Sequence, residues 1–172
     1  MVKFSSLCLL FSLAFSQIAY SRHNKNHHKV VKQPKTKIEQ YVADTEKEYG
    51  LPRCLLTAVI AHESSFEEKA INNTTYIPSY GLGQITLPTA RDFCNIKTKR
   101  ELFHREKNVH CTAKILRHHI RMYGSVHSAL AAYRAGTPCS KRRHSRTQRM
   151  CTRSDEIYIS AVERKKEALS YR

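Results

Sequence analysis

Apolar residues recur at helical spacing through most of the chain from about residue 37 onward. Ile38, Tyr41, Val42 and Tyr49 fall on one face of a segment that Gly50 ends. The same spacing, with Pro52 suited to a first helical turn, predicts more helices further along the chain. They are expected at about residues 53–63, 86–93, 107–123 and 126–133.

A last helix is expected after the basic residues near the C-terminal end. Ser154 can cap it, and Asp155 and Glu156 in its first turn favour the positive end of the helix dipole. Its apolar face includes Ile157, Val162 and Leu169.

Residues 67–85 are rich in Asn, Thr, Gly and Pro and are predicted to form loops and turns. Nowhere does the sequence sustain the two-residue alternation of a strand. The fold class is therefore expected to be mainly α.

The first residues have the composition of an export signal. Lys3 precedes an apolar stretch from Leu7 to Phe15, and Ala19 and Ser21 are small residues before a cleavage point. Residues 1–21 are therefore expected to be a signal peptide, which places the protein in the periplasm or cell envelope, or outside the cell. Residues 22–36 lack apolar periodicity and are expected to be a basic flexible linker, followed by one domain over residues 37–172.

The formal net charge of +16 is concentrated in two segments. Residues 22–37 and 141–153 each contain six Lys or Arg and no acid, and the second falls in an expected basic loop over residues 139–153. Anionic cell-wall polymers or a membrane surface are suitable partners. Neither segment has the interleaved aromatic residues of a base-stacking surface, so no specific nucleic acid is expected. The alternative is that both segments are simply solvated.

Six cysteines are present, and Cys8 falls in the predicted signal peptide. An oxidising compartment permits disulfides among the remaining five. Cys139–Cys151 is the first expected pair, because it would close the basic loop, and Cys94–Cys111 is the second. Cys54 is then left unpaired. The ten histidines do not show the paired ligand spacing of a structural zinc site, so no metal and no cofactor are expected.

Glu63 is the principal candidate for catalysis. It follows Ile60 by three residues and Val59 by four, so on a helix it shares their apolar face. Partial burial of a carboxyl group raises its pKa and suits it to donate a proton near neutral pH. The alternative is a helix-end residue that faces solvent.

Three short motifs follow one another in the chain: His62–Phe66 (HESSF), Ser79–Ile85 (SYGLGQI) and Ala131–Gly136 (AAYRAG). In this order and separation they resemble the catalytic domain of the soluble lytic transglycosylases over about residues 40–168, with a weaker match at Glu156 and Tyr158. The resemblance implies a lysozyme-like single domain with a loop-rich cleft that cleaves peptidoglycan glycan strands. The compact spacing is closest to small members that serve a secretion or virion assembly.

The same resemblance assigns roles to individual residues. It implies that Glu63 is the single general acid/base and that Tyr133 lies close to it. It also implies that Gly81, Leu82 and Gln84 shape the sugar-binding cleft. Ser64 and Ser79 can hydrogen-bond the substrate's acetamido group or Glu63, or else cap a turn or helix end.

The chain departs from the family's motifs at three positions. Gly83 stands where Met is usual, and its missing side chain is expected to loosen contacts with the saccharide. Arg134 replaces an Asn, and His62 before the Glu is unusual.

The expected reaction is cleavage of the MurNAc–GlcNAc β-1,4 linkage with formation of 1,6-anhydroMurNAc. Three alternatives remain open: a hydrolytic goose-type lysozyme relative with a second acid, a non-catalytic wall-binding module, and a basic antimicrobial protein.

Overall fold

The computed structural model describes residues 36–136 and 145–171, with side chains in the second range from Arg153 onward. The predicted signal peptide (1–21) lies outside these ranges, as do linker residues 22–35 and residues 139–144 of the expected basic loop. Among the described helices, none combines the length and apolar character needed to cross a bilayer.

Helices dominate the described chain, which confirms the predicted mainly α class. They are α2 (Lys37–Glu48), α3 (Leu55–Glu63), α4 (Leu87–Cys94), α5 (Lys99–Leu102), α6 (Arg105–Tyr123), α7 (Val126–Ala135) and α8 (Ser145–Ser170). The strands are β1 (Ile71–Asn72), β2 (Ser79–Tyr80) and β3 (Ile85–Thr86).

Local capping explains where several helices begin and end. Thr36 and Glu39 form a capping box at the start of α2, in which the Glu39 N–H donates to the Thr36 hydroxyl at 3.2 Å. Ser125 caps α7 in a similar way by accepting from the Ser128 N–H. Gly124, with φ of +75°, ends α6 in the left-handed conformation that glycine adopts without strain.

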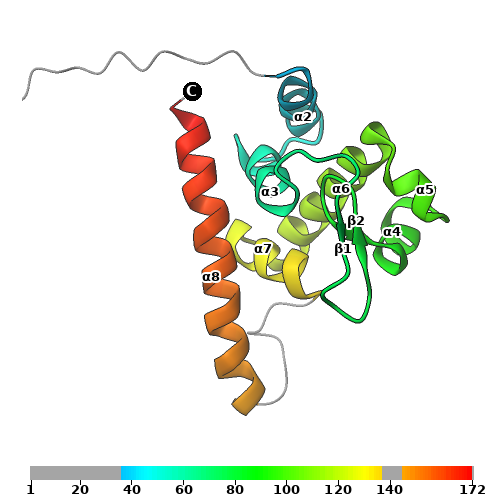
Figure 1. Cartoon of the computed structure of the whole chain (residues 1–172). Helices are drawn as coiled ribbons and strands as arrows, with labels where there is room; N and C mark the ends of the chain where they lie inside the picture. The colour runs from blue at the N-terminus through cyan, green and yellow to red at the C-terminus, as the bar shows by residue number, and fades with distance from the viewer. Residues whose placement is uncertain (1–35, 137–144, 172) are drawn as a thin grey trace, which may run out of the picture. The chain divides into compact units, whose positions relative to one another are not determined.

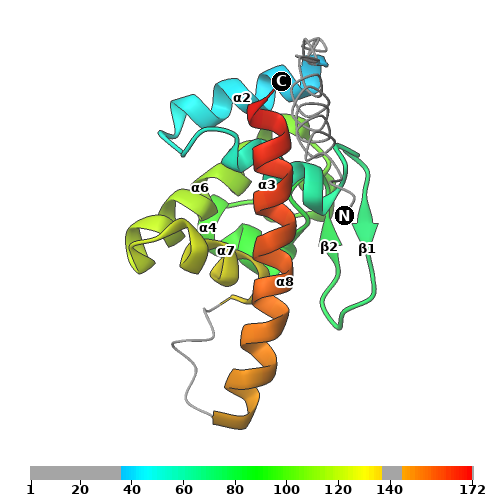
Figure 2. The same cartoon turned by 90° about the vertical axis from the view of Figure 1, so that its left-hand side faces the viewer.

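The core is built around α3, which is almost wholly enclosed. Leu55, Leu56, Val59 and Ile60 are all fully buried. In Figure 1 the long helix α8 lies along α3 and α7, and Figure 2 shows it crossing in front of both. Tyr158, Ile159 and Val162 of α8 belong to the same buried cluster as the α3 side chains. Glu63 therefore ends a helix that is held in place on several sides.

Helix α8 begins well before the predicted position. It starts at Ser145, so Ser154 lies inside the helix and residues 145–153 are helical rather than part of a basic loop. The two acids assigned to its first turn therefore lie inside the helix, where they pair with side chains of α7. Asp155 accepts from Arg134 at 3.1 Å, and Glu156 lies 3.0 Å from His127.

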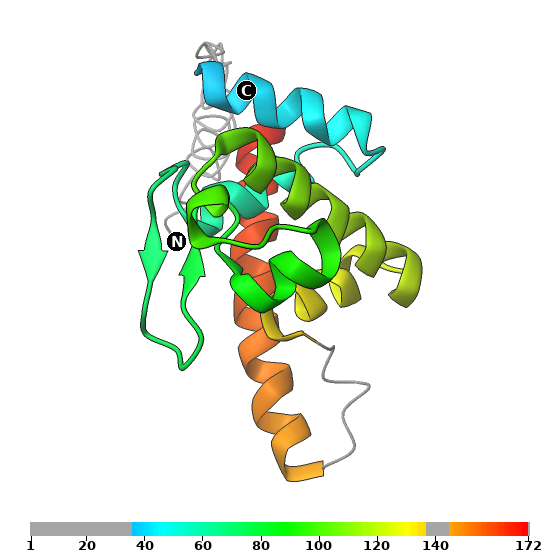
Figure 3. The same ribbon diagram turned by 90° about the vertical axis from the view of Figure 1, so that its right-hand side faces the viewer.

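A small antiparallel sheet occupies the segment predicted to be loops and turns. Tyr80 of β2 pairs with Ile71 on one side and with Ile85 on the other. Two-residue strands are too short to produce an alternating sequence pattern, so the sheet gave no signal. In Figure 3 the green strands β1 and β2 run side by side and extend away from the helices.

A disulfide joins Cys94 at the end of α4 to Cys111 within α6, which confirms the second expected pair. Cys54 is a free, buried thiol. The first expected pair, Cys139–Cys151, lies outside the residues whose side chains are described. The observed bond fastens α4, which carries one wall of the cleft described below, to the core helix α6.

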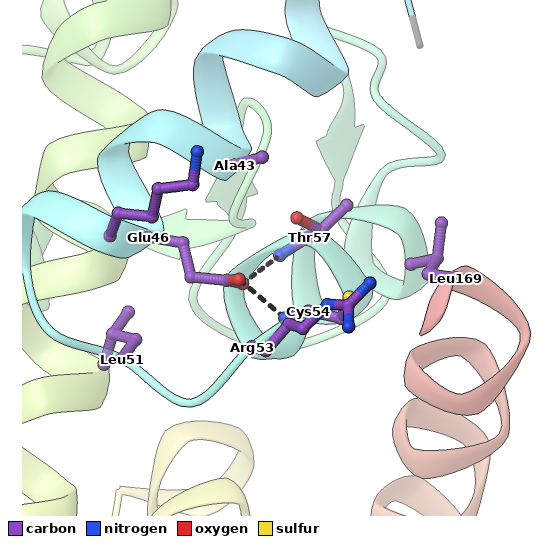
Figure 4. Close-up of a pocket in the computed structure, with 8 residues that line it drawn as sticks. Ala43, Glu46, Leu51, Arg53, Cys54, Thr57 and Leu169 are labelled. Atoms are coloured by element: carbon purple, nitrogen blue, oxygen red, sulfur yellow. Dashed lines mark hydrogen bonds between the residues drawn. The ribbon is translucent and has the colours of Figure 1, made fainter. Parts of the chain in front are cut away.

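A buried carboxylate from α2 caps the start of α3, and no sequence signal announced it. Glu46 is 5% exposed, and its oxygens accept from the backbone N–H groups of Cys54 at 2.6 Å, Leu56 at 2.8 Å and Thr57 at 3.4 Å. Cys54 has φ of +62°, and its side chain makes no cap of its own. Figure 4 shows Glu46 reaching across to this turn beside a pocket of about 330 Å³.

We expect Glu46→Ala to lower the free energy of unfolding by about 2–4 kcal/mol, because it leaves buried backbone donors without their charged acceptor. Glu48→Ala is the matched control on the same helix. Its carboxylate is exposed, and its removal should cost less than about 0.5 kcal/mol. Urea unfolding of the two variants measures the difference, and equal losses would contradict the capping role.

Candidate active site

A cleft of about 720 Å³ opens beside the C-terminal end of α3. Its walls come from the ends of α3 and α7, the β1–β2 hairpin, α4, α6 and α8. The residues that line it are His62, Glu63, Asn72, Thr75, Ile77, Ser79, Gln84, Ile85, Thr86, Thr89, Phe93, Ile115, His119, Ala132, Tyr133, Arg134, Ala135, Gly136 and Tyr158.

Glu63 is held in this cleft by one strong hydrogen bond and a sharp turn of the chain. The Tyr158 hydroxyl donates to Glu63 Oε1 at 2.6 Å. Directly after the helix, Ser65 and Phe66 have φ values of +53° and +67°, which turn the backbone away at some conformational cost. Phe66 then packs against the core, which keeps that turn in place.

Burial raises the pKa of Glu63 to about 7. Loss of hydration is the main cause, because it disfavours the charged carboxylate. The hydrogen bond from Tyr158 and the positive charge of Arg134 both oppose this rise. The direction agrees with the sequence prediction, and the carboxyl group can exchange a proton near neutral pH.

Two tyrosines frame Glu63 in their protonated form. Burial raises the pKa of both Tyr133 and Tyr158 above the ordinary value, and the nearby charge of Glu63 adds to the effect. The Tyr133 hydroxyl donates to the Gly83 carbonyl at 2.6 Å. Tyr158 was noted in the sequence only through a weak family match, because its contact with Glu63 depends on how α8 packs against α3.

Ser79, Gln84 and Tyr133 line the cleft, as expected of substrate-binding residues. The Ser79 hydroxyl donates to the Gln84 side-chain oxygen at 2.9 Å. Gln84 Nε2 donates in turn to the carbonyls of Gly81 at 2.8 Å and Ala70 at 3.2 Å. The polar edge of the cleft is therefore fixed by its own hydrogen bonds.

Ser64, Gly81 and Leu82 do not line the cleft directly. The Ser64 hydroxyl donates to the Ile60 carbonyl at 3.3 Å, which satisfies the end of α3. Leu82 is 1% exposed and belongs to the core. Gly81 is buried with φ of +72°. Gly81 and Leu82 therefore act on the cleft through the shape of the turn between β2 and β3.

Asn108 anchors that turn, a role that sequence reasoning did not assign. Its side-chain amide donates to the carbonyls of Tyr80 at 3.0 Å and Leu102 at 2.8 Å, and its oxygen accepts from the Gly83 N–H at 2.8 Å. A buried Asn near the start of an amphipathic helix was the available signal. Two of its partners, Tyr80 and Gly83, lie 28 and 25 residues away in the chain, so these contacts could not be read from the helix pattern.

The space beside Gly83 is filled, contrary to the expectation of a loosened cleft. A Cβ at this position would overlap the Thr112 hydroxyl and would lie 2.9 Å from the Tyr133 hydroxyl. Close packing of the β2–β3 turn against α6, rather than an empty subsite, accounts for the glycine.

Arg134 and Asp155 form a second polar cluster close to Glu63. Arg134 Nη1 lies 3.1 Å from Asp155 Oδ1, and the Asp155 side chain is 5% exposed while that of Arg134 is 36% exposed. The His62 ring packs edge-on against Tyr158 at 4.9 Å between centroids. Burial lowers the pKa of His62, with a smaller contribution from Lys165.

Of the described residues that line the cleft, Glu63 alone is acidic. The nearby acids Glu67 and Glu68 are engaged elsewhere. Glu68 accepts from Arg105 Nε at 2.7 Å, and Glu67 accepts from the Lys69 N–H at 3.0 Å. In the described part of the chain, no three His, Cys, Asp or Glu side chains are grouped closely enough to hold a metal ion.

Comparison with known proteins places this cleft in a family. The sequence pattern of the Transglycosylase SLT domain matches residues 40–155. The chain is also 35% identical over 104 residues to Protein IpgF of Shigella flexneri, and to the same extent to Protein IpgF of Shigella sonnei. These alignments cover 55% of this chain and 64% of each relative, so the chain spans somewhat less than two thirds of their length.

Two solved structures share the fold. An inactive mutant of the lytic transglycosylase Slt from Pseudomonas aeruginosa matches with a TM-score of 0.56 and 20% identity, over 73% of this chain and 22% of that one. The 70 kDa soluble lytic transglycosylase of Escherichia coli matches with a TM-score of 0.51 and 18% identity, over 72% and 21%. The predicted lysozyme-like fold is therefore confirmed.

The raised pKa of Glu63 predicts a pH-dependent cost to stability. Its folded pKa of about 7 lies above the ordinary 4.5, so folding favours the protonated form. This contribution is complete below pH 4.5 and is lost as pH rises through 7. Glu63→Gln mimics the protonated group, so it should match the native protein near pH 4.5 and be more stable by about 1–3 kcal/mol at pH 8. Thermal unfolding measured from pH 4.5 to pH 8 tests this, and a constant difference would contradict it.

Proposed function

We propose that this chain, which belongs to the Transglycosylase SLT domain family, is an exported lytic transglycosylase. It cleaves the MurNAc–GlcNAc β-1,4 linkage of peptidoglycan and leaves 1,6-anhydroMurNAc. The observation that carries the proposal is Glu63, the only acid lining the described cleft, with a pKa of about 7.

The chemistry needs one group that gives and then takes a proton. A glycosidic oxygen leaves readily only when it is protonated, and a carboxyl group of raised pKa supplies that proton. In the proposed reaction Glu63 donates to the leaving oxygen while the substrate's acetamido oxygen assists at the anomeric carbon. Glu63 then accepts the proton of the C6 hydroxyl as O6 bonds to that carbon, so no water is consumed.

The surrounding hydroxyl groups suit this exchange. When Glu63 has given up its proton, the Tyr158 hydroxyl at 2.6 Å stabilises the carboxylate. Tyr133 stays protonated beside it and ties α7 to Gly83. Tyr158 therefore orients the acid, and neither tyrosine competes for its proton.

The residues predicted to bind substrate are proposed to act either by direct contact with the sugars or by shaping the cleft. Ser79, Gln84 and Tyr133 lie in the cleft wall and can contact the sugars. Gly81 and Leu82 act by shaping the turn that carries Gln84. The Ser64 hydroxyl already serves the end of α3, which favours the capping role over contact with the acetamido group.

The hydrolytic alternative needs a second carboxylate to hold a water molecule. The described cleft residues provide none besides Glu63, so the structure favours the transglycosylase reaction. A vestigial wall-binding module would have no need for a carboxyl group whose pKa is raised in a cleft. The peptidoglycan substrate suits a location in the periplasm or cell envelope, and residues 1–21 are the proposed export signal.

We expect the mature protein to release 1,6-anhydromuropeptides from purified peptidoglycan, and Glu63→Gln to lower the rate by at least about a hundredfold. Because Glu63 must start protonated, the rate should fall as pH rises above about 7. Mass spectrometry of the released products measures both effects.

Glu67→Gln is the matched control, since it changes an exposed acid in the adjacent turn and should leave the rate unchanged. Products with free reducing ends would refute the transglycosylase reaction in favour of hydrolysis. Equal release by Glu63→Gln would refute the role of Glu63.

A further inference from the structure

We infer that Arg134 recognises a carboxylate on the 3-O substituent of the muramic acid bound next to Glu63, and so selects MurNAc over GlcNAc at that position. This inference rests on the proposed function. Arg134 occupies the position where the family motif has Asn, so the recognition would be a property of this chain.

Arg134 is the one Lys or Arg among the described residues that line the cleft. The two histidines of the cleft wall, His62 and His119, both have pKa values lowered mainly by burial, so they are largely uncharged at neutral pH. Arg134 therefore supplies the positive charge of the cleft. That charge acts on Glu63, which places the guanidinium within electrostatic reach of the proposed acid.

The ion pair with Asp155 orients the guanidinium and engages one of its N–H groups. Asp155 is buried, whereas more than a third of the Arg134 side chain is exposed. A guanidinium has five N–H donors, and among the described residues the bond to Asp155 is the one hydrogen bond it makes. Its planar donor pairs match the two oxygens of a carboxylate.

The substrate has such a carboxylate at a suitable place. MurNAc differs from GlcNAc by a lactyl ether at O3, and the 1,6-anhydro bond forms on MurNAc, so this sugar must lie beside Glu63. The lactyl carboxylate is free in glycan strands without peptide. In strands with stem peptides it forms an amide, and the peptide contributes its own carboxylates. Both sources present the same chemical group to Arg134.

The test compares four substrates and follows kcat and KM for release of anhydro products. They are glycan strands with stem peptides, strands stripped of peptide by an amidase, and both after their carboxylates are coupled to a neutral amine. For the native protein, neutralising the carboxylate should lower kcat/KM about tenfold or more, mainly through KM. The strand type with the larger loss identifies the source.

For Arg134→Asn, kcat/KM should already be low on the charged strands. Neutralising the carboxylates should not lower it further. Arg134→Lys should keep part of the preference for charged over neutralised strands, since lysine keeps the positive charge but lacks the planar donor pairs. Arg121→Asn is the matched control. It removes the same charge from an exposed site outside the cleft and should behave as the native protein does.

Two results would overturn the inference. Neutralising the substrate carboxylates could lower kcat/KM by the same factor for the native protein and for Arg134→Asn. The carboxylate would then be bound elsewhere, for example by the basic segments. Alternatively, Arg134→Asn could lower kcat equally on charged and neutralised strands. Arg134 would then stabilise the fold or position Glu63 and would not bind the substrate carboxylate.

Two further variants keep the test decisive. If Arg134→Asn fails to fold because Asp155 loses its ion pair with Arg134, the double variant Arg134→Asn/Asp155→Asn removes the buried acidic group as well. If the native protein releases no product, the proposed function fails while the inference is still tested by binding. Glu63→Gln should then bind charged strands about tenfold or more tightly than Glu63→Gln/Arg134→Asn, with no difference on neutralised strands.

Discussion

Glu63 ends a helix whose apolar residues are enclosed by the rest of the domain, so the packing of the core fixes where its carboxyl group enters the cleft. Leu55, Leu56, Val59 and Ile60 are fully buried, and burial of each such side chain contributes roughly 1.5–3 kcal/mol. The energy that fixes α3 in the core thus also maintains the desolvation of Glu63. The raised pKa follows from the fold rather than from any single neighbour.

Several contacts far from Glu63 serve this constraint. Glu46 caps the buried start of α3, and Tyr158 from α8 meets its end, so both ends of the short helix are held by side chains from other helices. Asn108 holds the β2–β3 turn against α6, and the Cys94–Cys111 bond fastens α4 to the same helix. Two walls of the cleft, the β2–β3 turn and α4, are therefore both attached to α6.

The sequence predicted the helices and the principal acid because these depend on local patterns. Apolar spacing and glycine stops place α2, α3, α6 and α7, and the motif around Glu63 identifies both the carboxylate and its family. Contacts between distant segments gave no comparable signal. Asp155 and Glu156 resembled the first turn of a helix, whereas they lie inside α8, which begins at Ser145, and pair with side chains of α7. Gly83 suggested looser contacts with the saccharide, whereas Thr112 from a distant helix fills the space where its side chain would lie.

The central claim is that one carboxyl group in the cleft stays protonated at a pH where ordinary carboxyl groups have ionised. The most direct measurement is a carbon-13 NMR titration of the glutamate side-chain carboxyls in the protein, with Glu63→Gln used to assign the Glu63 signal. The structure predicts a midpoint of about 7 for this signal. A midpoint near the ordinary value of 4.5 would contradict the account, because Glu63 would then be ionised at neutral pH and have no proton to donate.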